Sequence, residues 1–391
     1  MLKRYLDLKL PKKQSLFLWG ARKTGKSTYL KSHYPDSLWI DLLRNDTFLR
    51  YNKQPHLLRE EILSIPDEIL AVPIIIDEIQ KIPSLLDEIH WLIENGPKNC
   101  SFILCGSSLR RLKHEGANLL GGRAWRQIFL PLCFPEIKKF DLLRTLNHGL
   151  LPAHYLNEHQ PKRLLEGYLA DYLIPEVQWE SRIRQLGAFG RFLEAIAYSN
   201  GEIVNYSNIG REAGVSVKTI QSYVELLLDM LVGYLIFPYA KSMNRQLITS
   251  APKFYFFDTG IVRALKNNST FTVLKGPDVG HAVEHYIFLE LLAYKELTHA
   301  DFDIKYWRTK SGIEVDFILK QGNVAIEVKT SQPIEKKDIR GLIEFSKENK
   351  TERRIVVSLE PRKRIMSADN ITIEVFPIEE FLENLWAGKI C

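Results

Sequence analysis

The sequence predicts an α/β protein made of three successive regions, and three observations support this prediction. A glycine-rich loop lies between an apolar strand and a helix near the amino terminus, an arrangement found at the carboxyl edge of a parallel sheet. A three-helix pattern with a glycine turn occupies the middle of the chain. Towards the carboxyl terminus, two strands that carry carboxylates flank a tight turn. We therefore expect a parallel sheet, a helical centre and a second α/β region.

The first region contains a loop with the spacing of a phosphate-binding motif. Gly20 and Gly25 are separated by four residues, and Lys26 and Ser27 follow. Backbone N–H groups of such a loop and the start of the next helix would surround phosphates. Lys26 would contact the β- and γ-phosphates, and the Ser27 hydroxyl would bind Mg²⁺. The predicted nucleotide contacts are Gly20, Ala21, Arg22, Lys23, Thr24, Gly25, Lys26, Ser27 and Thr28.

A second apolar strand supplies the carboxylates that a nucleotide site needs. The run from Val72 to Ile76 ends in Asp77 and Glu78. Asp77 would hold magnesium, and Glu78 would polarise the attacking water. The alternative is a pair of solvated carboxylates at a strand end. The loop upstream favours the catalytic interpretation.

A third apolar strand, from Ser101 to Cys105, ends in a Gly-Ser-Ser turn. Its hydroxyls would arrive at the carboxyl edge of the sheet, where Ser107 or Ser108 could sense the γ-phosphate. Such turns are common, so the sensor interpretation competes with an ordinary turn. The next arginines are surface charges or include an arginine finger for a neighbouring subunit. These arginines are Arg110, Arg111, Arg123 and Arg126.

The stretch from Trp19 to Glu136 resembles the AAA+ ATPases of bacteria and archaea that are known as predicted ATP-binding proteins. The resemblance rests on the P-loop, the Ile-Ile-Ile-Asp-Glu strand, the Gly-Ser-Ser turn and the segment from Phe129 to Glu136. That family usually has Ala-Gly-Arg and a Pro-Leu-Ser-Phe segment, where this chain has Gly-Gly-Arg123 and Cys133. The resemblance implies ATP hydrolysis, with Arg123 as the best arginine-finger candidate. A finger that acts on a neighbouring copy would require a homo-oligomer.

Length and composition agree with a multi-domain protein. The 391 residues correspond to about two to four domains. The cysteines have neither paired metal spacing nor the density of a disulfide scaffold, so we expect buried thiols in a reducing compartment. The chain shows no secretory leader and no apolar run of membrane-spanning length, which predicts a cytoplasmic protein without membrane contact. A net charge of +6 mildly favours polyanionic partners.

The middle of the chain has the pattern of a winged helix-turn-helix. Helices are expected over 192–198, 206–213 and 217–230, with a turn at Gly214 and the start of a wing over 231–237. The third helix would place a polar face in the major groove of DNA. Because this fold also mediates protein contacts and the face has one lysine, DNA contact competes with protein contact. The predicted DNA-contacting residues are Ser216, Lys218, Thr219, Gln221 and Ser222.

Carboxylates recur in order in the last region. Glu284 lies on a predicted helix, Asp316 lies on the strand 313–319, and Glu327 and Lys329 lie on the strand 324–329 after a turn at 321–323. Residues two apart share a face of a strand, so Glu327 and Lys329 face the same way and Asp316 can lie beside them. This set suits metal-assisted phosphodiester hydrolysis. The alternative is a surface ion pair that contributes little.

This last region resembles the PD-(D/E)xK nucleases, and the AAA+ family is commonly followed by a winged helix and such a domain. The resemblance implies Mg²⁺ or Mn²⁺ held by Asp316, Glu327 and Glu284, with Lys329 orienting the nucleophile. The expected boundaries are 1–145 for the ATPase core, 146–190 for a helical lid, 191–265 for the winged helix and 266–391 for the restriction-endonuclease-like α/β domain. The lid has helical spacing over 161–180, with a break at Pro175.

The residues and the resemblance together predict an ATP-binding and ATP-hydrolysing protein that binds DNA. Nucleotide state would reposition the winged helix and the nuclease-like domain, and Asp316 and Glu327 would act on bound DNA. One alternative is an ATP-driven motor on branched DNA without cleavage. Another is a nucleotide switch whose last two modules bind proteins.

Overall fold

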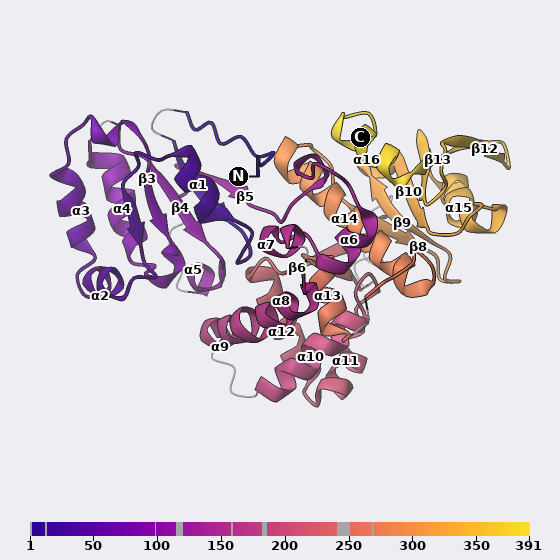
Figure 1. The fold of residues 1–391 in the computed structure, drawn as a ribbon, viewed down its shortest axis with the longest axis horizontal. Helices are drawn as coiled ribbons and strands as arrows, with labels where there is room; N and C mark the ends of the chain where they lie inside the picture. The colour runs from indigo at the N-terminus through magenta and orange to yellow at the C-terminus, as the bar shows by residue number, and fades with distance from the viewer. Residues whose placement is uncertain are drawn as a thin grey trace. The chain divides into compact units, whose positions relative to one another are not determined.

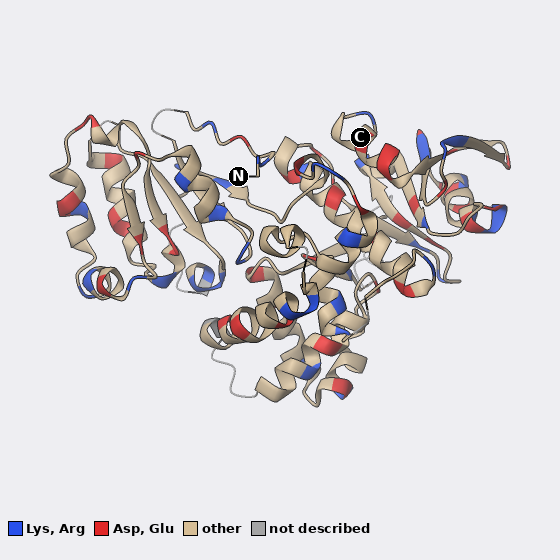
Figure 2. Cartoon of the chain, in the orientation of Figure 1, with Lys and Arg blue, Asp and Glu red and all other residues tan. Residues whose placement is uncertain are grey.

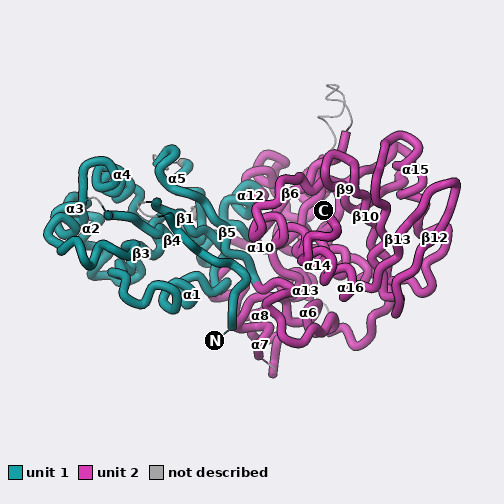
Figure 3. The backbone as a smooth tube through the Cα atoms, turned by 90° about the horizontal axis from the view of Figure 1, so that it is seen from above, with its two compact units in different colours: residues 1–131, 175–184, 225–232 teal, residues 132–174, 185–224, 233–391 magenta. Residues whose placement is uncertain are grey.

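The structure is a computed structural model that describes residues 2–11, 14–97, 99–114, 120–157, 159–181, 186–240, 251–267 and 270–391. The chain divides into two compact units, coloured teal and magenta in Figure 3. Unit 1 contains residues 1–131, 175–184 and 225–232, and unit 2 contains residues 132–174, 185–224 and 233–391. Each unit therefore gathers segments that lie far apart in the sequence.

Unit 1 is built on a five-stranded parallel sheet with the order β2-β3-β4-β1-β5 (Figure 1). This confirms the predicted parallel sheet, and it brings the carboxyl ends of β1, β3 and β4 to one edge. Its strands are β1 Ser15–Trp19, β2 Trp39–Asp41, β3 Ile74–Asp77, β4 Phe102–Gly106 and β5 Ala124–Ile128. Its helices include α1 Lys26–His33, α2 Asn45–Lys53, α3 His56–Leu63, α4 Leu85–Asn95 and α5 Arg110–His114, with short 3-10 turns at Ile69–Ala71 and Ile79–Lys81.

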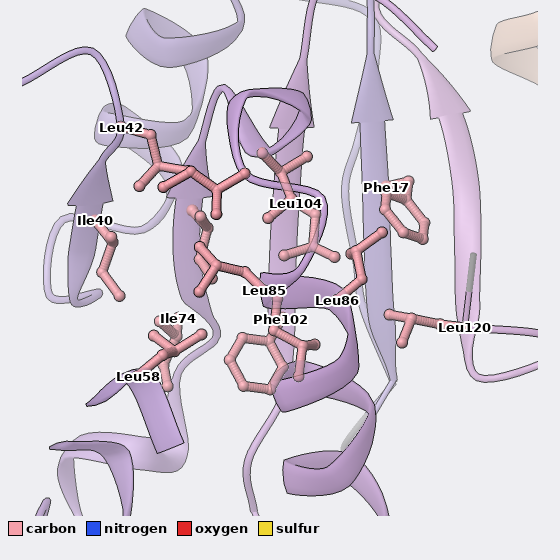
Figure 4. Packing of buried hydrophobic residues seen from close by; sticks show 14 of the residues in the cluster. Phe17, Ile40, Leu42, Leu58, Ile74, Leu85, Leu86, Phe102, Leu104 and Leu120 are labelled. Carbon is pink, nitrogen blue, oxygen red and sulfur yellow. The ribbon is translucent and has the colours of Figure 1, made fainter. Parts of the chain in front are cut away.

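The strands β1, β3 and β4 of this sheet are apolar and fully buried, and helices pack against them. Figure 4 shows Leu85 and Leu86 of α4 among side chains of the sheet such as Phe17, Phe102 and Leu104, all of which are buried. Near-continuous apolar runs of this kind are typical of parallel strands that are covered on both faces. The packing fixes the strand ends that carry the polar site residues.

Unit 2 begins with helices whose bounds partly correct the sequence analysis. They are α6 Leu142–His148, α7 Pro152–Leu156, α8 Pro161–Tyr168 and a π-helical turn Leu169–Leu173. The next helix, α9 Ile174–Ser181, belongs to unit 1 from residue 175 on. The predicted break at Pro175 is wrong, because the helical path continues through it. Proline lacks an N–H donor for the usual bond to the carbonyl four residues earlier. A π-helical turn, Leu169–Leu173, lies directly before Ile174 and Pro175, so the helix is locally widened where the proline enters it.

The three helices predicted in the middle of the chain are present as α10 Leu186–Tyr198, α11 Tyr206–Ala213 and α12 Val217–Asp229. Asn205 begins α11 by accepting a hydrogen bond from the Asn208 N–H at 3.0 Å. Gly214 ends it in the left-handed conformation, with φ 71°. Asn and Gly are the residues expected at these two positions, which is why the sequence located the turn.

The second sheet has eight strands in the order β12-β13-β11-β10-β9-β8-β6-β7 and is mixed. The predicted hairpin is confirmed, because β9 and β10 pair antiparallel with Leu319 opposite Val324. The hairpin β6–β7 joins the same sheet, because β6 pairs in parallel with β8. The strands are β6 Gly233–Pro238, β7 Lys253–Phe256, β8 Lys305–Arg308, β9 Glu314–Leu319, β10 Val324–Lys329, β11 Arg353–Ser358, β12 Arg364–Ala368 and β13 Ile371–Pro377.

Helices hold the carboxylate-bearing strands of this sheet in place. They are α13 Thr259–Leu265, α14 Pro277–Thr298, α15 Arg340–Glu348 and α16 Ile378–Trp386. Phe288 of α14 stacks on Tyr255 with ring centroids 4.3 Å apart. At the start of α15, a Cβ on Gly341 would lie 1.9 Å from the Glu314 carbonyl oxygen, so only glycine permits this approach to β9.

Charged residues of both signs are interspersed along both units, as Figure 2 shows. Cys100, Cys105 and Cys133 are buried free thiols, as expected, and Cys391 is half-buried. Burial raises the pKa of the Cys100 thiol to about 12. Within the residues described above, no helix is both long enough and apolar enough to cross a membrane.

Candidate functional site

The glycine loop of unit 1 follows β1 directly and leads into α1. A Cβ on Gly20 would lie 2.3 Å from the Phe129 carbonyl oxygen, which explains the glycine there. Gly25 precedes α1 with φ 99°, a conformation that side chains disfavour. Thr24 is buried, and its hydroxyl donates to the Ala21 carbonyl at 2.9 Å. Among the other predicted contacts, Lys23 and Thr28 are exposed and Ala21 is buried.

Lys26 turns its ammonium group back into this loop. Its Nζ donates to the carbonyl oxygens of Gly20 at 2.6 Å and Ala21 at 3.1 Å. Lys26 is 7% exposed, and burial lowers the pKa of its ammonium group, while Glu78 and Asp77 oppose this shift. Carbonyl oxygens are weaker partners for a cation than phosphate oxygens are. The lysine is therefore placed to exchange these contacts for those of a bound polyphosphate.

Ser27 and Asp77 meet across the edge of the sheet. The Ser27 Oγ donates to the Asp77 Oδ2 at 2.8 Å. Burial raises the pKa of the Asp77 carboxyl, and the Ser27 hydrogen bond opposes this shift. A hydroxyl and a carboxylate oxygen at the carboxyl end of a strand are hard oxygen donors of the kind that Mg²⁺ prefers. These two residues fit the predicted magnesium ligands.

Glu78 and Ser107 lie in one buried network. Glu78 adopts a left-handed conformation with φ 60°, which is uncommon for a residue with a side chain and is typical of strained functional positions. The Ser107 Oγ is 3.2 Å from the Glu78 Oε2, and the Gln80 Nε2 donates to both groups, at 3.0 Å to Ser107. The network links the predicted catalytic carboxylate to the predicted sensor.

The structure adds Glu176 of α9 to this network, a residue that the sequence analysis left without a function. Its Oε1 accepts a hydrogen bond from the Ser107 Oγ at 2.7 Å and lies 2.8 Å from the Arg22 Nε. Glu176 is 8% exposed, and burial raises the pKa of its carboxyl while Arg22 opposes the shift. Local spacing could not reveal these contacts, because Arg22 and Ser107 lie far from Glu176 in the sequence.

The carboxylates of unit 2 converge from β9, β10 and α14. Asp316 is buried and accepts a hydrogen bond from the Val328 N–H at 2.7 Å. Burial raises the pKa of the Asp316 carboxyl, and the nearby Glu284 raises it further. Burial and the proximity of Asp316 hold the pKa of Glu327 well above its usual value. The Oε2 atom of Glu327 is buried, and no described group donates a hydrogen bond to it.

Cations lie between these carboxylates. Lys329 pairs with Glu327, as the two-residue spacing predicted. Lys253 of β7 is 3% exposed and pairs with both Glu284, at 3.2 Å, and Glu314. The Tyr255 hydroxyl also donates to Glu284, at 2.6 Å. The sequence analysis missed Lys253, Tyr255 and Glu314, because strand pairing rather than local spacing brings them to the site.

This arrangement differs from the predicted three-carboxylate shell. Among the residues that the structure describes, no three His, Cys, Asp or Glu side chains are arranged to hold a metal ion. Glu284 is instead occupied by Lys253 and Tyr255. Buried like charges repel one another strongly, so a cation between them stabilises the cluster. The oxygen donors of Asp316 and Glu327 are nevertheless of the type that Mg²⁺ or Mn²⁺ takes.

The predicted DNA-contacting face of α12 is exposed as expected. Lys218, Gln221 and Ser222 are exposed, and Thr219 is half-buried. The Ser216 Oγ accepts a hydrogen bond from the Thr219 N–H at 3.2 Å, so Ser216 also begins the helix. The opposite positions that were expected to pack inward are buried. They are Ile220, Tyr223, Val224 and Leu227.

Comparison with protein families agrees with the site of unit 1. Residues 12–138 match a family model described as an AAA domain. These residues form an AAA domain. Residues 139–272 and 279–381 match two models described as "Domain of unknown function (DUF8612)" and "Domain of unknown function (DUF4143)". The description of the first model agrees with the predicted nucleotide site, and the other two descriptions name no activity.

Two curated relatives are similarly uninformative about activity. "Uncharacterized protein Mb2031c" of Mycobacterium bovis and "Uncharacterized protein Rv2008c" of Mycobacterium tuberculosis are each 24% identical over 238 residues. The match covers 59% of this chain and 52% of each relative, so it spans about half the length of these relatives.

A solved structure from Pyrococcus horikoshii is also similar in part. It is described as a signal transduction ATPase with numerous domains (STAND) protein with a tetratricopeptide repeat sensor. The sequence identity is 13%, with 76% of this chain and 53% of that chain covered. A TM-score of 0.22 is too low to establish a shared architecture.

Within the AAA domain, Arg123 lies away from the P-loop of its own chain. It directly precedes β5, and Ala124 pairs with Ser15 at the start of β1, whereas the P-loop follows the end of β1. Its guanidinium pairs with Glu94 of α4 and is about a third exposed. In a parallel sheet these two positions are at opposite edges. As an arginine finger, Arg123 could therefore act only on the nucleotide of another copy.

Proposed function

We propose that the AAA domain binds ATP with Mg²⁺ and hydrolyses it at the edge formed by β1, β3 and β4. The observation that carries this proposal is the contact between Ser27 and Asp77 beside the buried Lys26. Lys26 would neutralise the terminal phosphates, and Ser27 and Asp77 would hold the metal. Bound there, Mg²⁺ would neutralise charge on the phosphates.

Glu78 is the general base in this proposal. Its carboxylate accepts a hydrogen bond from Gln80 and lies 3.2 Å from the Ser107 hydroxyl, and these contacts orient it at the end of β3. It would accept a proton from the water that attacks the γ-phosphorus, and ADP and phosphate would leave. Ser107, at the end of the neighbouring strand β4, would contact the γ-phosphate.

Phosphate release from ATP and Mg²⁺ tests this function. We expect Glu78→Gln to bind ATP with unchanged affinity and to lose about 10²–10³-fold in hydrolysis rate, because a proton acceptor is removed. Glu60→Gln, at an exposed position on α3, is the matched control and should hydrolyse ATP at the wild-type rate. Undiminished hydrolysis by Glu78→Gln would show that another group accepts the proton.

A second candidate function concerns the carboxylates of unit 2. We propose that Asp316 and Glu327 hold Mg²⁺ or Mn²⁺ and that this site cleaves DNA, with Lys329 orienting the attacking water. The unpartnered, buried Oε2 of Glu327 favours this function, because buried polar atoms ordinarily have partners. Four carboxylates against three cations, Lys253, Lys329 and Arg308, also leave an excess of negative charge that a bound metal ion would relieve. The metal would activate water and stabilise charge on the scissile phosphate.

Cleavage of labelled single-stranded, duplex and branched DNA with each metal tests this second function. We expect Asp316→Ala to abolish cleavage, while Glu379→Gln on the exposed face of α16 retains it. Intact DNA with ATP hydrolysis that branched DNA stimulates would instead identify a motor without cleavage. Intact DNA and no DNA binding at low salt would favour a nucleotide switch that binds proteins, because phosphate contacts are strongest at low salt.

A further inference from the structure

We propose that Glu176 is a positioning residue that reports the presence of a triphosphate to α9, and this proposal rests on ATP binding at the P-loop. Glu176 contacts two groups that a γ-phosphate would also attract, the guanidinium of Arg22 and the hydroxyl of Ser107. A bound triphosphate would compete with Glu176 for both partners. A diphosphate lacks the group that competes most directly.

The first step is a competition for Arg22. This arginine belongs to the P-loop, its side chain is about a third exposed, and its Nε lies 2.8 Å from the Glu176 Oε1. Phosphate oxygens carry more charge than a carboxylate and match a guanidinium in geometry. The triphosphate would therefore draw Arg22 away from Glu176.

The second step is a competition for one proton. The Ser107 hydroxyl can donate a single hydrogen bond, and two carboxylates lie within its reach. Glu176 at 2.7 Å is closer than Glu78 at 3.2 Å, so Glu176 takes the proton in this arrangement. If Glu176 withdraws, the hydroxyl can turn to Glu78 or to the γ-phosphate. Glu176 thus determines whether the Ser107 hydroxyl can donate its hydrogen bond to Glu78.

The consequence falls on α9. Glu176 is nine-tenths buried, and an unpaired carboxylate at such depth is strongly unfavourable. It must therefore become neutral or move towards solvent when its partners leave, and its movement would displace the first turn of α9. This helix is also the segment where the chain passes from unit 2 to unit 1, because residue 174 belongs to one and residue 175 to the other.

A second contact keeps α9 in place without involving the P-loop. The Arg111 guanidinium lies 3.4 Å from the centre of the Trp179 ring. Loss of the Glu176 contacts therefore loosens one end of the helix rather than releasing it. The expected signal is a local increase in hydrogen exchange in the first turn of α9, which is larger with an ATP analogue than with ADP.

Two measurements on the full-length protein test the proposal. Hydrogen exchange of the peptide that covers α9 should be faster with a non-hydrolysable ATP analogue than with ADP, and Glu176→Gln should remove this difference. In binding measurements, Glu176→Gln should raise the affinity for the ATP analogue about tenfold, which corresponds to about 1.4 kcal/mol, and should change ADP affinity much less. Glu166→Gln, at an exposed position on α8, is the matched control and should behave as wild type in both.

The outcomes separate this proposal from the proposed function. If the wild-type protein binds neither nucleotide, ATP binding is wrong and the proposal for Glu176 is wrong with it. If both nucleotides bind and α9 exchanges at the same rate with each, only the proposal for Glu176 is overturned. Equal changes in ATP-analogue and ADP affinity in Glu176→Gln would indicate a purely structural residue and would also overturn it. The wild-type exchange comparison keeps the test decisive if the variant does not fold.

Discussion

The two units each bury a lysine beside carboxylates, but the lysines have opposite surroundings. In unit 1, Lys26 makes its hydrogen bonds to the carbonyl oxygens of Gly20 and Ala21, and burial lowers the pKa of its ammonium group. In unit 2, Lys253 pairs with Glu284 and Glu314. Burial lowers its pKa too, but the surrounding carboxylates outweigh this effect and raise the pKa above its usual value.

This difference shows which ligand charge each site favours. A buried ammonium group that is bound to carbonyl oxygens gains from an anion, and a polyphosphate is such an anion. Lysines that are already neutralised by a larger number of carboxylates gain little from an anion. That site gains from a cation, which would relieve repulsion among the carboxylates. The comparison therefore agrees with the phosphate binding that we propose for unit 1 and with the metal binding that we propose for unit 2.

Replacing each lysine in turn should give the largest difference between the two units, measured as a change in the free energy of unfolding. Lys253→Met should lower the free energy of unfolding of unit 2 by about 3–5 kcal/mol, because it removes a buried cation and leaves the partly buried Glu284 unpaired, while Glu314 keeps Arg308. Lys26→Met should change the stability of unit 1 by less than about 1 kcal/mol, because its partners are backbone carbonyls. Hydrogen exchange of peptides from β7 and β1 would report the two units separately.

A double variant provides the control for this contrast. Lys253→Met combined with Glu284→Gln should recover part of the lost stability, because the unpaired charge is removed with its partner. Equal stability losses in Lys26→Met and Lys253→Met would contradict the opposite surroundings that we describe.

The ATPase activity of Lys26→Met is a second test of the comparison between Lys26 and Lys253. We expect ATP hydrolysis to fall about 10²–10³-fold, because the variant loses the charge that stabilises the phosphates in the transition state. Phosphate release and nucleotide affinity measure this effect. Lys31→Met, at an exposed position one turn further along α1, should retain activity. A variant that loses neither affinity nor rate would remove Lys26 from the proposed mechanism.

Sequence patterns predicted those parts of both sites that depend on neighbouring residues. The P-loop, the Asp77–Glu78 strand end and the β9–β10 hairpin each have a local cause in glycine, apolar periodicity or two-residue spacing. The patterns did not reveal Glu176, Lys253 or Tyr255, whose partners lie in distant segments. The break predicted at Pro175 failed because the chain stays helical through a π-helical turn directly before the proline, which no local pattern announces.

The pH dependence of stability tests the carboxylate cluster. The pKa of Glu327 is raised in the folded state, so folding favours its protonated form. Its contribution to stability is therefore complete below its ordinary pKa of about 4.5 and is lost as pH rises through the raised value. Glu327→Gln should remove this loss, so that the variant gains about 1–3 kcal/mol relative to wild type at pH 8 and little at pH 4.

Urea unfolding between pH 4 and pH 8 measures this difference, with Glu379→Gln on α16 as the matched control. The control should follow the pH profile of the wild type, because its side chain is exposed. If bound Mg²⁺ or Mn²⁺ neutralises the cluster, adding the metal should flatten the wild-type profile and leave Glu327→Gln nearly unchanged. If the free energies of unfolding of the wild type and of Glu327→Gln change with pH in the same way, Glu327 is ionised in the folded state without a cost in stability.

The smallest effect is expected for Lys218. This lysine is exposed to solvent, unlike the buried Lys26 and Lys253. It lies on the polar face of α12, where a phosphate contact would require little desolvation. If this face binds DNA, Lys218→Ala should weaken binding uniformly across sequences and lower the slope of log affinity against log salt by about one. Fluorescence anisotropy over a salt series measures the slope, and Lys162→Ala on the exposed face of α8 is the control. Identical slopes for Lys218→Ala and wild type would exclude a phosphate contact by this residue and would leave protein binding as the favoured use of the face.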